Sequence, residues 1–211
     1  MKIIVLYGTS DMGKTTSLKI VYEVLKRINK EETKVFKYID MNHYKDFLDV
    51  LVLDNALTGD IIDQCLDKPE TYSTPKKYDL TNINLSKDEI GIDNNTISLR
   101  VNYLDVINQR NHKITSGCTT RVGIDTEGDY GYNQNQPSLY KRLCYLYGND
   151  SEIIICACNK RSKHKPFECI RDFVLKYNAS AYFIPVSTGS DMKKAWLYNA
   201  ASVLWVLRNL I

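Results

Sequence analysis

The 211-residue chain lacks the features of a membrane protein or an electrostatic nucleic-acid binder. No stretch reaches the roughly 18 uninterrupted apolar residues of a membrane span. The net charge of +3 is too small to draw the protein to nucleic acid or to an anionic membrane. The apolar run at the start is too short for the hydrophobic part of a signal peptide. We therefore expect a soluble, cytoplasmic protein with no membrane partner and no indicated nucleic-acid partner.

The chain also lacks cysteine pairs at the spacing of a metal site. Its six cysteines contain no C-x-x-C motif, and they are Cys65, Cys118, Cys144, Cys156, Cys158 and Cys169. Zinc sites and disulfide frameworks need partners at ligand spacing, so neither is expected. Cys156 and Cys158 lie two residues apart in an apolar run, which predicts that they share one face of a strand as small buried side chains. Reduced thiols agree with a cytoplasmic protein.

What the sequence does contain is a glycine-rich motif directly after its first apolar run. Residues 2–7 are Lys-Ile-Ile-Val-Leu-Tyr, which predicts a buried strand. The next residues are Gly8, Thr9, Ser10, Asp11, Met12, Gly13, Lys14, Thr15 and Thr16. They match the phosphate-binding pattern G-x-x-x-x-G-K-[ST], and residues 15–29 follow with apolar residues at helical spacing. The pattern therefore stands in the strand, loop, helix setting that its chemistry requires.

Each residue type in this motif suits the binding of a polyphosphate. Gly8 and Gly13 have no Cβ, so the backbone N–H groups of the loop can approach phosphate oxygens closely. The positive end of the following helix favours the same anion. Lys14 would reach the β- and γ-phosphates, and the Thr15 hydroxyl would be a ligand of Mg²⁺.

A second chemical stretch follows the predicted strand at 118–125. A phosphate loop needs a carboxylate at the end of a neighbouring strand to complete the magnesium site. Asp125 comes directly after the apolar residues and is the default candidate. Glu127 and Asp129 are further carboxylates within reach, and one of them could orient an attacking water. Asp125 and Asp129 are both kept as candidate metal ligands, and Lys14, Asp125, Glu127 and Asp129 as candidate catalytic residues.

Over residues 2–29 the chain resembles the P-loop NTPase superfamily. The resemblance implies a three-layer α/β fold and a nucleoside triphosphate, ATP or another, bound with Mg²⁺. Two further features are similar to small uncharacterised bacterial P-loop ATP-binding proteins. They are Gly128-Asp129-Tyr130 and Ile155-Cys156-Ala157-Cys158. That likeness implies that Asp129 rather than Asp125 is the shared acid.

A weaker resemblance connects the chain with GTPases. Asp125-Thr126-Glu127-Gly128 is similar to the D-x-x-G switch motif, and Asn159-Lys160 is similar to the start of the guanine-reading N-K-x-D motif. Val186-Ser187-Thr188 is similar to the later serine-containing loop of these proteins. Ser162, however, stands where the base-reading aspartate belongs, and without this carboxylate the guanine donors lose their paired acceptor.

The rest of the chain alternates between strand and helix patterns. Strands are predicted at 33–40, 96–107, 118–125, 152–158 and 181–186, and residues 96–107 and 118–125 should form an antiparallel pair at the edge of the sheet. Helical character is predicted at 46–57, 60–66, from Pro137-Ser138 onward, at 167–177 and in a C-terminal helix capped by Ser190. Residues 67–95 are polar and form either an ordered insertion or a lid. Residues 160–165 form a basic loop that either binds an anionic group or is simply solvated.

Together these patterns predict one α/β domain over residues 1–211, with a mainly parallel sheet of five or six strands and helices on both faces. Residues 41–117 would be an insertion and edge-strand region after the second strand. The predicted function is Mg-dependent binding of ATP, with hydrolysis or transfer of the γ-phosphoryl group to a small acceptor. A GTPase-like switch and a non-catalytic nucleotide-dependent interaction module with a protein partner are the alternatives.

Overall fold

The computed structural model describes residues 1–28, 48–65, 118–127, 138–160 and 166–211. The predictions for 33–40, 67–95 and 96–107 concern residues outside this part of the chain. Within it, no helix is long and apolar enough to cross a membrane.

Five strands form one sheet in the order β2-β3-β4-β1-β5. Their bounds are β1 Lys2–Gly8, β2 Leu48–Asp54, β3 Thr119–Asp125, β4 Ile153–Asn159 and β5 Ser180–Pro185. β1, β3, β4 and β5 run parallel, whereas β2 pairs with β3 in the antiparallel direction. Every residue of β4 is buried, as its continuous apolar sequence predicts for a strand covered on both faces. The mainly parallel α/β architecture is therefore confirmed.

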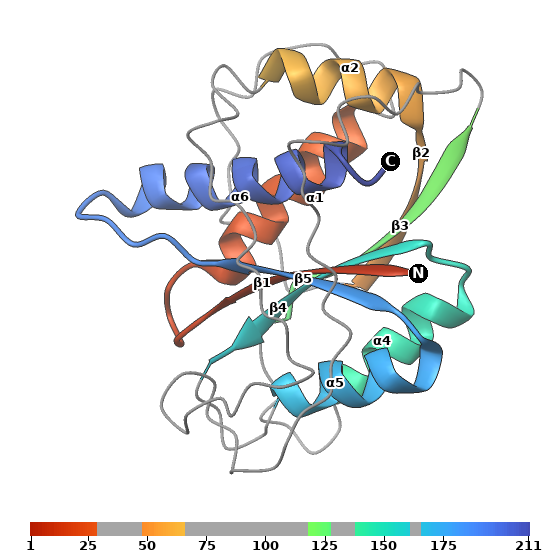
Figure 1. Ribbon diagram of the computed structural model, residues 1–211. Helices are drawn as coiled ribbons and strands as arrows, with labels where there is room; N and C mark the ends of the chain where they lie inside the picture. Colours follow the sequence, from red (N-terminus) through yellow and green to blue (C-terminus); the bar gives the residue numbers. More distant parts are fainter. Residues whose placement is uncertain (29–47, 66–117, 128–137, 161–165) are drawn as a thin grey trace.

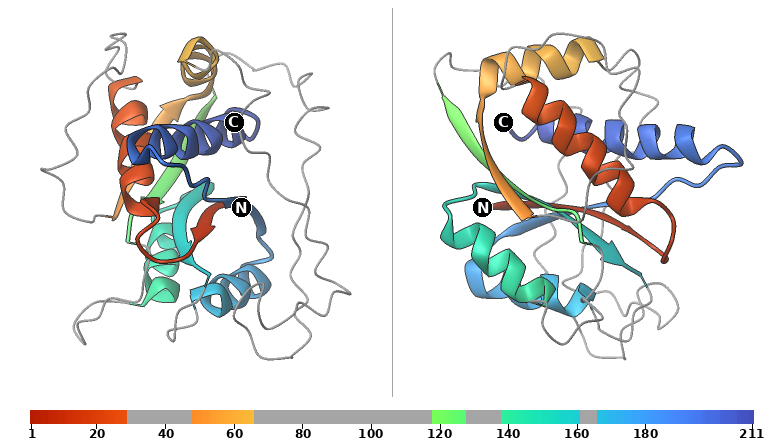
Figure 2. Two further views of the ribbon diagram at one scale, coloured as in Figure 1. Left: turned by 90° about the vertical axis from the view of Figure 1, so that its left-hand side faces the viewer. Right: turned by 180° about the vertical axis from the view of Figure 1, so that it is seen from behind.

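Helices cover both faces of this sheet (Figure 1). On one face lie α1 Lys14–Ile28 and α6 Met192–Arg208, and α2 Asn55–Cys65 packs on these two helices. On the other face lie α4 Leu139–Gly148 and α5 Pro166–Tyr177. The views from one side and from behind show the same arrangement of helices, sheet and helices (Figure 2). Because β1, β3, β4 and β5 run parallel, their carboxyl ends lie at one edge of the sheet, where ligands of open α/β sheets usually bind.

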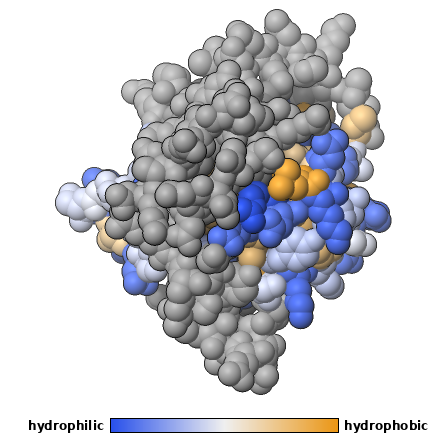
Figure 3. All heavy atoms as spheres, turned by 60° about the horizontal axis from the view of Figure 1, so that its bottom comes forward, coloured by the Kyte–Doolittle hydropathy of each residue, from blue (hydrophilic) through white to orange (hydrophobic). Residues whose placement is uncertain are grey.

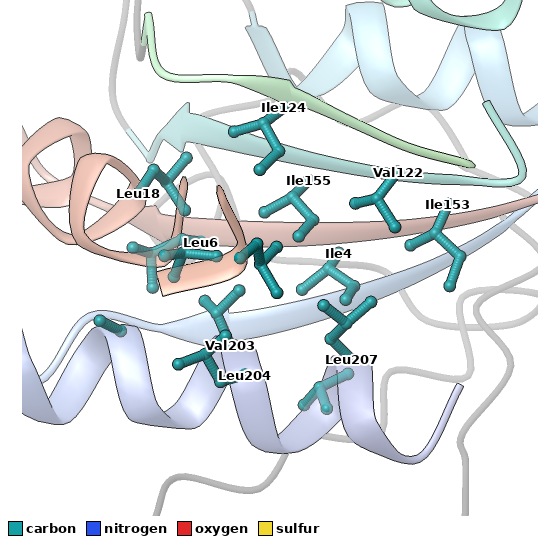
Figure 4. Packing of buried hydrophobic residues seen from close by; sticks show 14 of the residues in the cluster. Ile4, Leu6, Leu18, Val122, Ile124, Ile153, Ile155, Val203, Leu204 and Leu207 are labelled. Atoms are coloured by element: carbon teal, nitrogen blue, oxygen red, sulfur yellow. The ribbon is translucent and has the colours of Figure 1, made fainter. Parts of the chain in front are cut away.

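Alternate residues of β1, β4 and β5 enter two separate apolar clusters. Ile4 and Leu6 of β1 face α1 and α6, where they pack near Val203 and Leu207 (Figure 4). Residues 3 and 5 of the same strand point to the opposite cluster, beneath α4 and α5. This division follows directly from the two-residue period of a strand. Seen from the side of α4 and α5, the described surface is mostly hydrophilic (Figure 3).

The cluster beneath α4 and α5 also contains Cys156 and Cys158, which are at most 1% exposed. The prediction that they are small buried side chains on one face is confirmed. The described thiols are all free, and they belong to Cys118, Cys144, Cys156, Cys158 and Cys169.

The prediction of helix at 46–57 is wrong, because residues 48–54 form β2. Leu48 and Val50 pack toward the cluster beneath α4 and α5, whereas Leu51 and Leu53 belong to the opposite one. The segment thus has apolar side chains on both sides, and pairing with β3 makes it a strand. The sequence predicts residues 96–107 as the antiparallel partner of 118–125, and residues 96–107 lie outside the described part of the chain. In that part, β2 (48–54) is the antiparallel neighbour of β3 at the edge of the sheet.

The C-terminal helix is capped by Asp191 rather than by Ser190. The Asp191 carboxylate accepts hydrogen bonds from the backbone N–H groups of Lys193 and Lys194, at 3.1 and 3.2 Å. The hydrogen bond from the Lys194 backbone is the main reason why the pKa of Asp191 is lowered. Ser138 caps α4, which begins at Leu139, and its hydroxyl accepts a hydrogen bond from the Lys141 backbone N–H.

Replacing Phe173 by alanine tests the packing beneath α5. Phe173 is fully buried and its ring contacts Tyr140, Tyr147 and Tyr177. We expect Phe173→Ala to lower the free energy of unfolding by about 3–5 kcal/mol in urea denaturation, because it leaves a cavity. Leu175→Ala on the same helix is the control: Leu175 is 52% exposed, so a change within about 0.5 kcal/mol is expected. Equal losses in the two variants would contradict this packing.

Candidate functional site

The glycine-rich segment forms a tight connection between β1 and α1. The strand ends at Gly8, and the helix begins at Lys14. Asp11 and Gly13 adopt left-handed backbone conformations, with φ of 62° and 73°. Gly8 lies close to the residue after β5: a Cβ at Gly8 would lie 3.1 Å from two side-chain carbons of Val186, which is a tight contact. The strand, loop and helix that the sequence predicts are therefore present, and the left-handed conformation of Gly13 favours glycine at that position.

Lys14 is folded back over this loop. Its side chain is buried, and its Nζ donates hydrogen bonds to the Thr9 carbonyl and, at 2.9 Å, to Oδ1 of Asn159. A buried ammonium group needs such acceptors, because its loss of hydration is otherwise costly. The cation is thereby held at the end of β1, between the loop and the end of β4.

Asn159 is the residue of this site that the sequence analysis missed. It is the last residue of β4 and stands opposite Gly8 in the parallel register. Its Oδ1 accepts from Lys14, and its Nδ2 donates to the Ser10 hydroxyl at 3.0 Å. The Lys160 backbone N–H also donates to the Gly8 carbonyl, at 2.8 Å. A polar residue at the carboxyl end of a buried strand was the signal for it, but the sequence alone suggested only a base-reading motif.

Asp125 has a different environment from the one predicted. Its Oδ2 lies 2.8 Å from Nε of Arg142, and the two side chains are 1% and 4% exposed. The same guanidinium pairs with the Glu127 carboxylate at 3.2 Å and donates to the Glu127 carbonyl at 3.0 Å. The other Asp125 oxygen accepts from the Glu127 backbone N–H. Arg142 of α4 therefore holds both acids in one buried ion network.

The strand register places Asp125 level with the middle of β1 rather than with its carboxyl end, where the loop begins. Asp125 stands opposite Cys156 of β4, which stands opposite Val5 of β1. Val5 is three residues before Gly8, which corresponds to about 10 Å along the strand. β4 also separates β3 from β1, so the acid lies two strands away from the loop.

Asp125 also points to the opposite face of the sheet from α1. Ile124, its neighbour, belongs to the cluster under α1 and α6, whereas Asp125 contacts Arg142 of α4. The structure brings Lys14 and the loop together with Asn159, and it does not bring Asp125 to them. Asp129 lies outside the described residues.

The neighbouring Cys156 thiol is held in its neutral form. Burial raises the pKa of Cys156 well above its ordinary value, and the Asp125 carboxylate raises it further. A thiolate is the nucleophilic form of cysteine, so this side chain belongs to the apolar core rather than to the chemistry of the site.

The described residues contain no group of three or more histidine, cysteine, aspartate or glutamate side chains that could hold a metal ion. Magnesium with nucleotides commonly takes only one or two protein ligands together with phosphate oxygens. Thr15, the second residue of α1, has the hydroxyl and the position for such a role. A cavity of about 610 Å³ lies elsewhere, at the amino ends of the strands, and is lined by Lys2, Ser151 and Glu152 among others.

Comparisons with protein-family models, curated proteins and solved structures found no match for this chain.

Removing the positive charge of Arg142 tests the ion network. We expect Arg142→Met to lower the free energy of unfolding by about 3–5 kcal/mol at neutral pH, because it leaves the carboxylate of Asp125 buried without its cation. Arg121→Met is the matched control: Arg121 is 49% exposed and pairs with Asp150, so a loss below about 1 kcal/mol is expected.

A double variant, Arg142→Met with Asp125→Asn, separates charge from packing. It should recover part of the stability lost in Arg142→Met, since the buried carboxylate is gone. Urea denaturation gives the free energy of unfolding of the wild type, the two single variants and the double variant. A double variant no more stable than Arg142→Met would contradict a charge-based role.

Proposed function

We propose that this protein binds a magnesium nucleoside triphosphate, with ATP as the preferred ligand, at the loop of residues 8–16. It would then hydrolyse the nucleotide or transfer its γ-phosphoryl group to a small acceptor. The observation that carries the proposal is the position of Lys14. It is the first residue of a helix that follows a glycine-rich loop, and its ammonium group is fixed over that loop by the Thr9 carbonyl and Asn159.

The roles of the loop residues follow from this arrangement. The backbone N–H groups of the loop and the first turn of α1 would surround phosphate oxygens, and Lys14 would contact the β- and γ-phosphates. The residues concerned are Gly8, Thr9, Ser10, Asp11, Met12, Gly13, Lys14, Thr15 and Thr16. Thr15 would be a ligand of Mg²⁺, which when bound would neutralise charge on the phosphate chain. Phosphoryl transfer depends mainly on positioning and charge, and this loop could supply both.

The acids take different roles in this proposal. Asp125 is recessed, faces α4 and is paired with Arg142, so we assign to it the positioning of the chain that leaves β3. Glu127 shares that network, although it is more exposed than Asp125. Asp129 is then the acid proposed for the magnesium side of the site, in keeping with the Gly128-Asp129-Tyr130 resemblance.

The GTPase alternative loses support from the contacts of Asn159. An asparagine that reads guanine must present its amide to the base. Here Oδ1 accepts from Lys14 and Nδ2 donates to Ser10, so both ends of the amide contact the loop. The resemblance of Asn159-Lys160 to a guanine-reading motif is thus better explained by loop positioning. This is why ATP rather than GTP is preferred in the proposal.

Replacing Lys14 by alanine tests the binding site itself. Because charged hydrogen bonds to phosphate would be lost, we expect Lys14→Ala to weaken binding of a non-hydrolysable ATP analogue about 100-fold or more. Calorimetric titration with ATP and GTP analogues, each with and without Mg²⁺, measures this. Lys19→Ala, on the same helix, should keep the wild-type affinity. Unchanged affinity in Lys14→Ala would refute the assignment. Hydrolysis no faster in the wild type than in Lys14→Ala would instead favour a non-catalytic binding module.

Replacing Asn159 by alanine distinguishes loop positioning from base reading. If Asn159 holds Lys14 and Ser10, Asn159→Ala should weaken the binding of all three ligands by a similar factor of about tenfold, since one net hydrogen bond to a charged group is lost. The three ligands are the ATP analogue, the GTP analogue and inorganic tripolyphosphate. The same calorimetric titrations give all three affinities. A selective loss of GTP binding, with tripolyphosphate binding unchanged, would show that the side chain reads the base.

A further inference from the structure

Trp196 of α6 lies directly against the glycine that precedes Lys14. An added Cβ on Gly13 would stand 2.0 Å from Nε1 of the indole and 2.3 Å from its Cδ1. These distances are far shorter than any allowed contact, so the nitrogen-bearing edge of the ring rests on the bare Cα of Gly13. The left-handed conformation of Gly13, with φ of 73°, adds a second reason for glycine. The phosphate loop is therefore packed against one particular aromatic side chain.

The indole N–H at this contact has no hydrogen-bond acceptor in the described part of the chain, although the Nε1 atom is buried. Indole nitrogen can only donate, and buried tryptophans usually place this donor against an acceptor. Leaving it unsatisfied costs free energy that a phenylalanine at the same position would not cost. Packing alone therefore does not explain why a tryptophan stands at residue 196.

The indole N–H of Trp196 lies beside the loop at which we propose that the nucleotide binds. Gly13 is adjacent to Lys14, whose ammonium group is held over the same loop. A bound nucleotide would place phosphate oxygens and a ribose beside this segment, and these oxygens are hydrogen-bond acceptors. The ring is also anchored, because Trp196 packs against the apolar cluster beneath α6. An anchored donor beside a phosphate loop is preorganised for a ligand, which reduces the entropy lost on binding.

We propose that the indole N–H of Trp196 is a ligand-binding donor, which donates a hydrogen bond to an oxygen of the bound nucleotide. This inference rests on the proposed nucleotide site and adds a residue from α6 to it. Because Nε1 is buried against Gly13, a local displacement of the edge of the ring exposes it to the ligand, while the contacts of Asn159 with Lys14 and Ser10 keep the loop in place. The acceptor is an oxygen of the phosphate chain or of the ribose, and the probes described below separate these two sources.

The test uses the fact that the chain contains only two tryptophans, Trp196 and Trp205. Trp205 lies on the same helix and is 7% exposed. Trp196→Phe keeps an aromatic ring and removes the donor, whereas Trp205→Phe makes the same chemical change away from Gly13. We expect Trp196→Phe to bind a non-hydrolysable ATP analogue with Mg²⁺ about tenfold more weakly than the wild type, which corresponds to one hydrogen bond. Trp205→Phe should bind it with wild-type affinity.

Titration with inorganic tripolyphosphate locates the acceptor. A similar weakening with tripolyphosphate places the acceptor on the phosphate chain, and a weakening with the nucleotide alone places it on the ribose. Thermal unfolding without ligand accompanies each titration. A purely structural role would lower the melting temperature of Trp196→Phe and leave its affinity unchanged, and that result would overturn the inference.

Fluorescence gives a measurement that does not depend on Trp196→Phe. In the Trp205→Phe protein all tryptophan emission comes from Trp196, so saturation with the ATP analogue should change its spectrum. No change at saturation would overturn the inference. If Trp196→Phe binds as tightly as the wild type, the inference fails while the proposed function stands. If the wild type does not bind the nucleotide at all, both fail.

Discussion

The hydrogen bond between the Lys14 ammonium group and Asn159 is the contact on which the candidate site depends. It joins the first residue of α1 to the last residue of β4, which is 145 residues further along the chain. The contact is possible only because β1 and β4 are parallel neighbours with Gly8 opposite Asn159. A buried ammonium group must be given acceptors, so the start of α1, the shape of the loop and the position of β4 constrain one another.

Local chemistry explains which parts of this arrangement could be predicted from the sequence. β1, the loop and α1 are consecutive, and their pattern of apolar residues and glycines specifies them without reference to the rest of the chain. The order of the strands is different, because it depends on how distant segments pack. Nothing in the sequence shows that β4, and not β3, lies beside β1. For that reason Asp125 resembled the acid of the loop, and Asn159 resembled a base-reading residue.

Two predictions about local structure, the helix at 46–57 and the helix cap at Ser190, are wrong for a related reason. Residues 48–53 contain five apolar residues out of six, a pattern that fits a buried helix or a buried strand equally well. Hydrogen bonding to β3 decides the matter, and that partner is more than 60 residues away. Ser190 and Asp191 are both good helix caps, and only the direction of the Asp191 carboxylate toward the backbone of residues 193 and 194 distinguishes them. In both cases the sequence allows two structures and tertiary contacts select one.

The same long-range contacts bear on whether the glycine-rich segment is a binding loop or only a connection. A simple turn between a strand and a helix needs nothing beyond its own residues. This loop is held from three sides: Asn159 at the end of β4 contacts Lys14 and Ser10, Val186 after β5 packs against Gly8, and Trp196 of α6 rests on Gly13. The contact of Trp196 with Gly13 requires glycine and leaves a buried donor unsatisfied, so the arrangement is costly for a mere connection. Such costs are understandable where a loop must keep one shape before its ligand arrives, because rigidity reduces the entropy lost on binding. The restraint of the loop by three distant segments therefore supports a binding role more strongly than the sequence motif does alone.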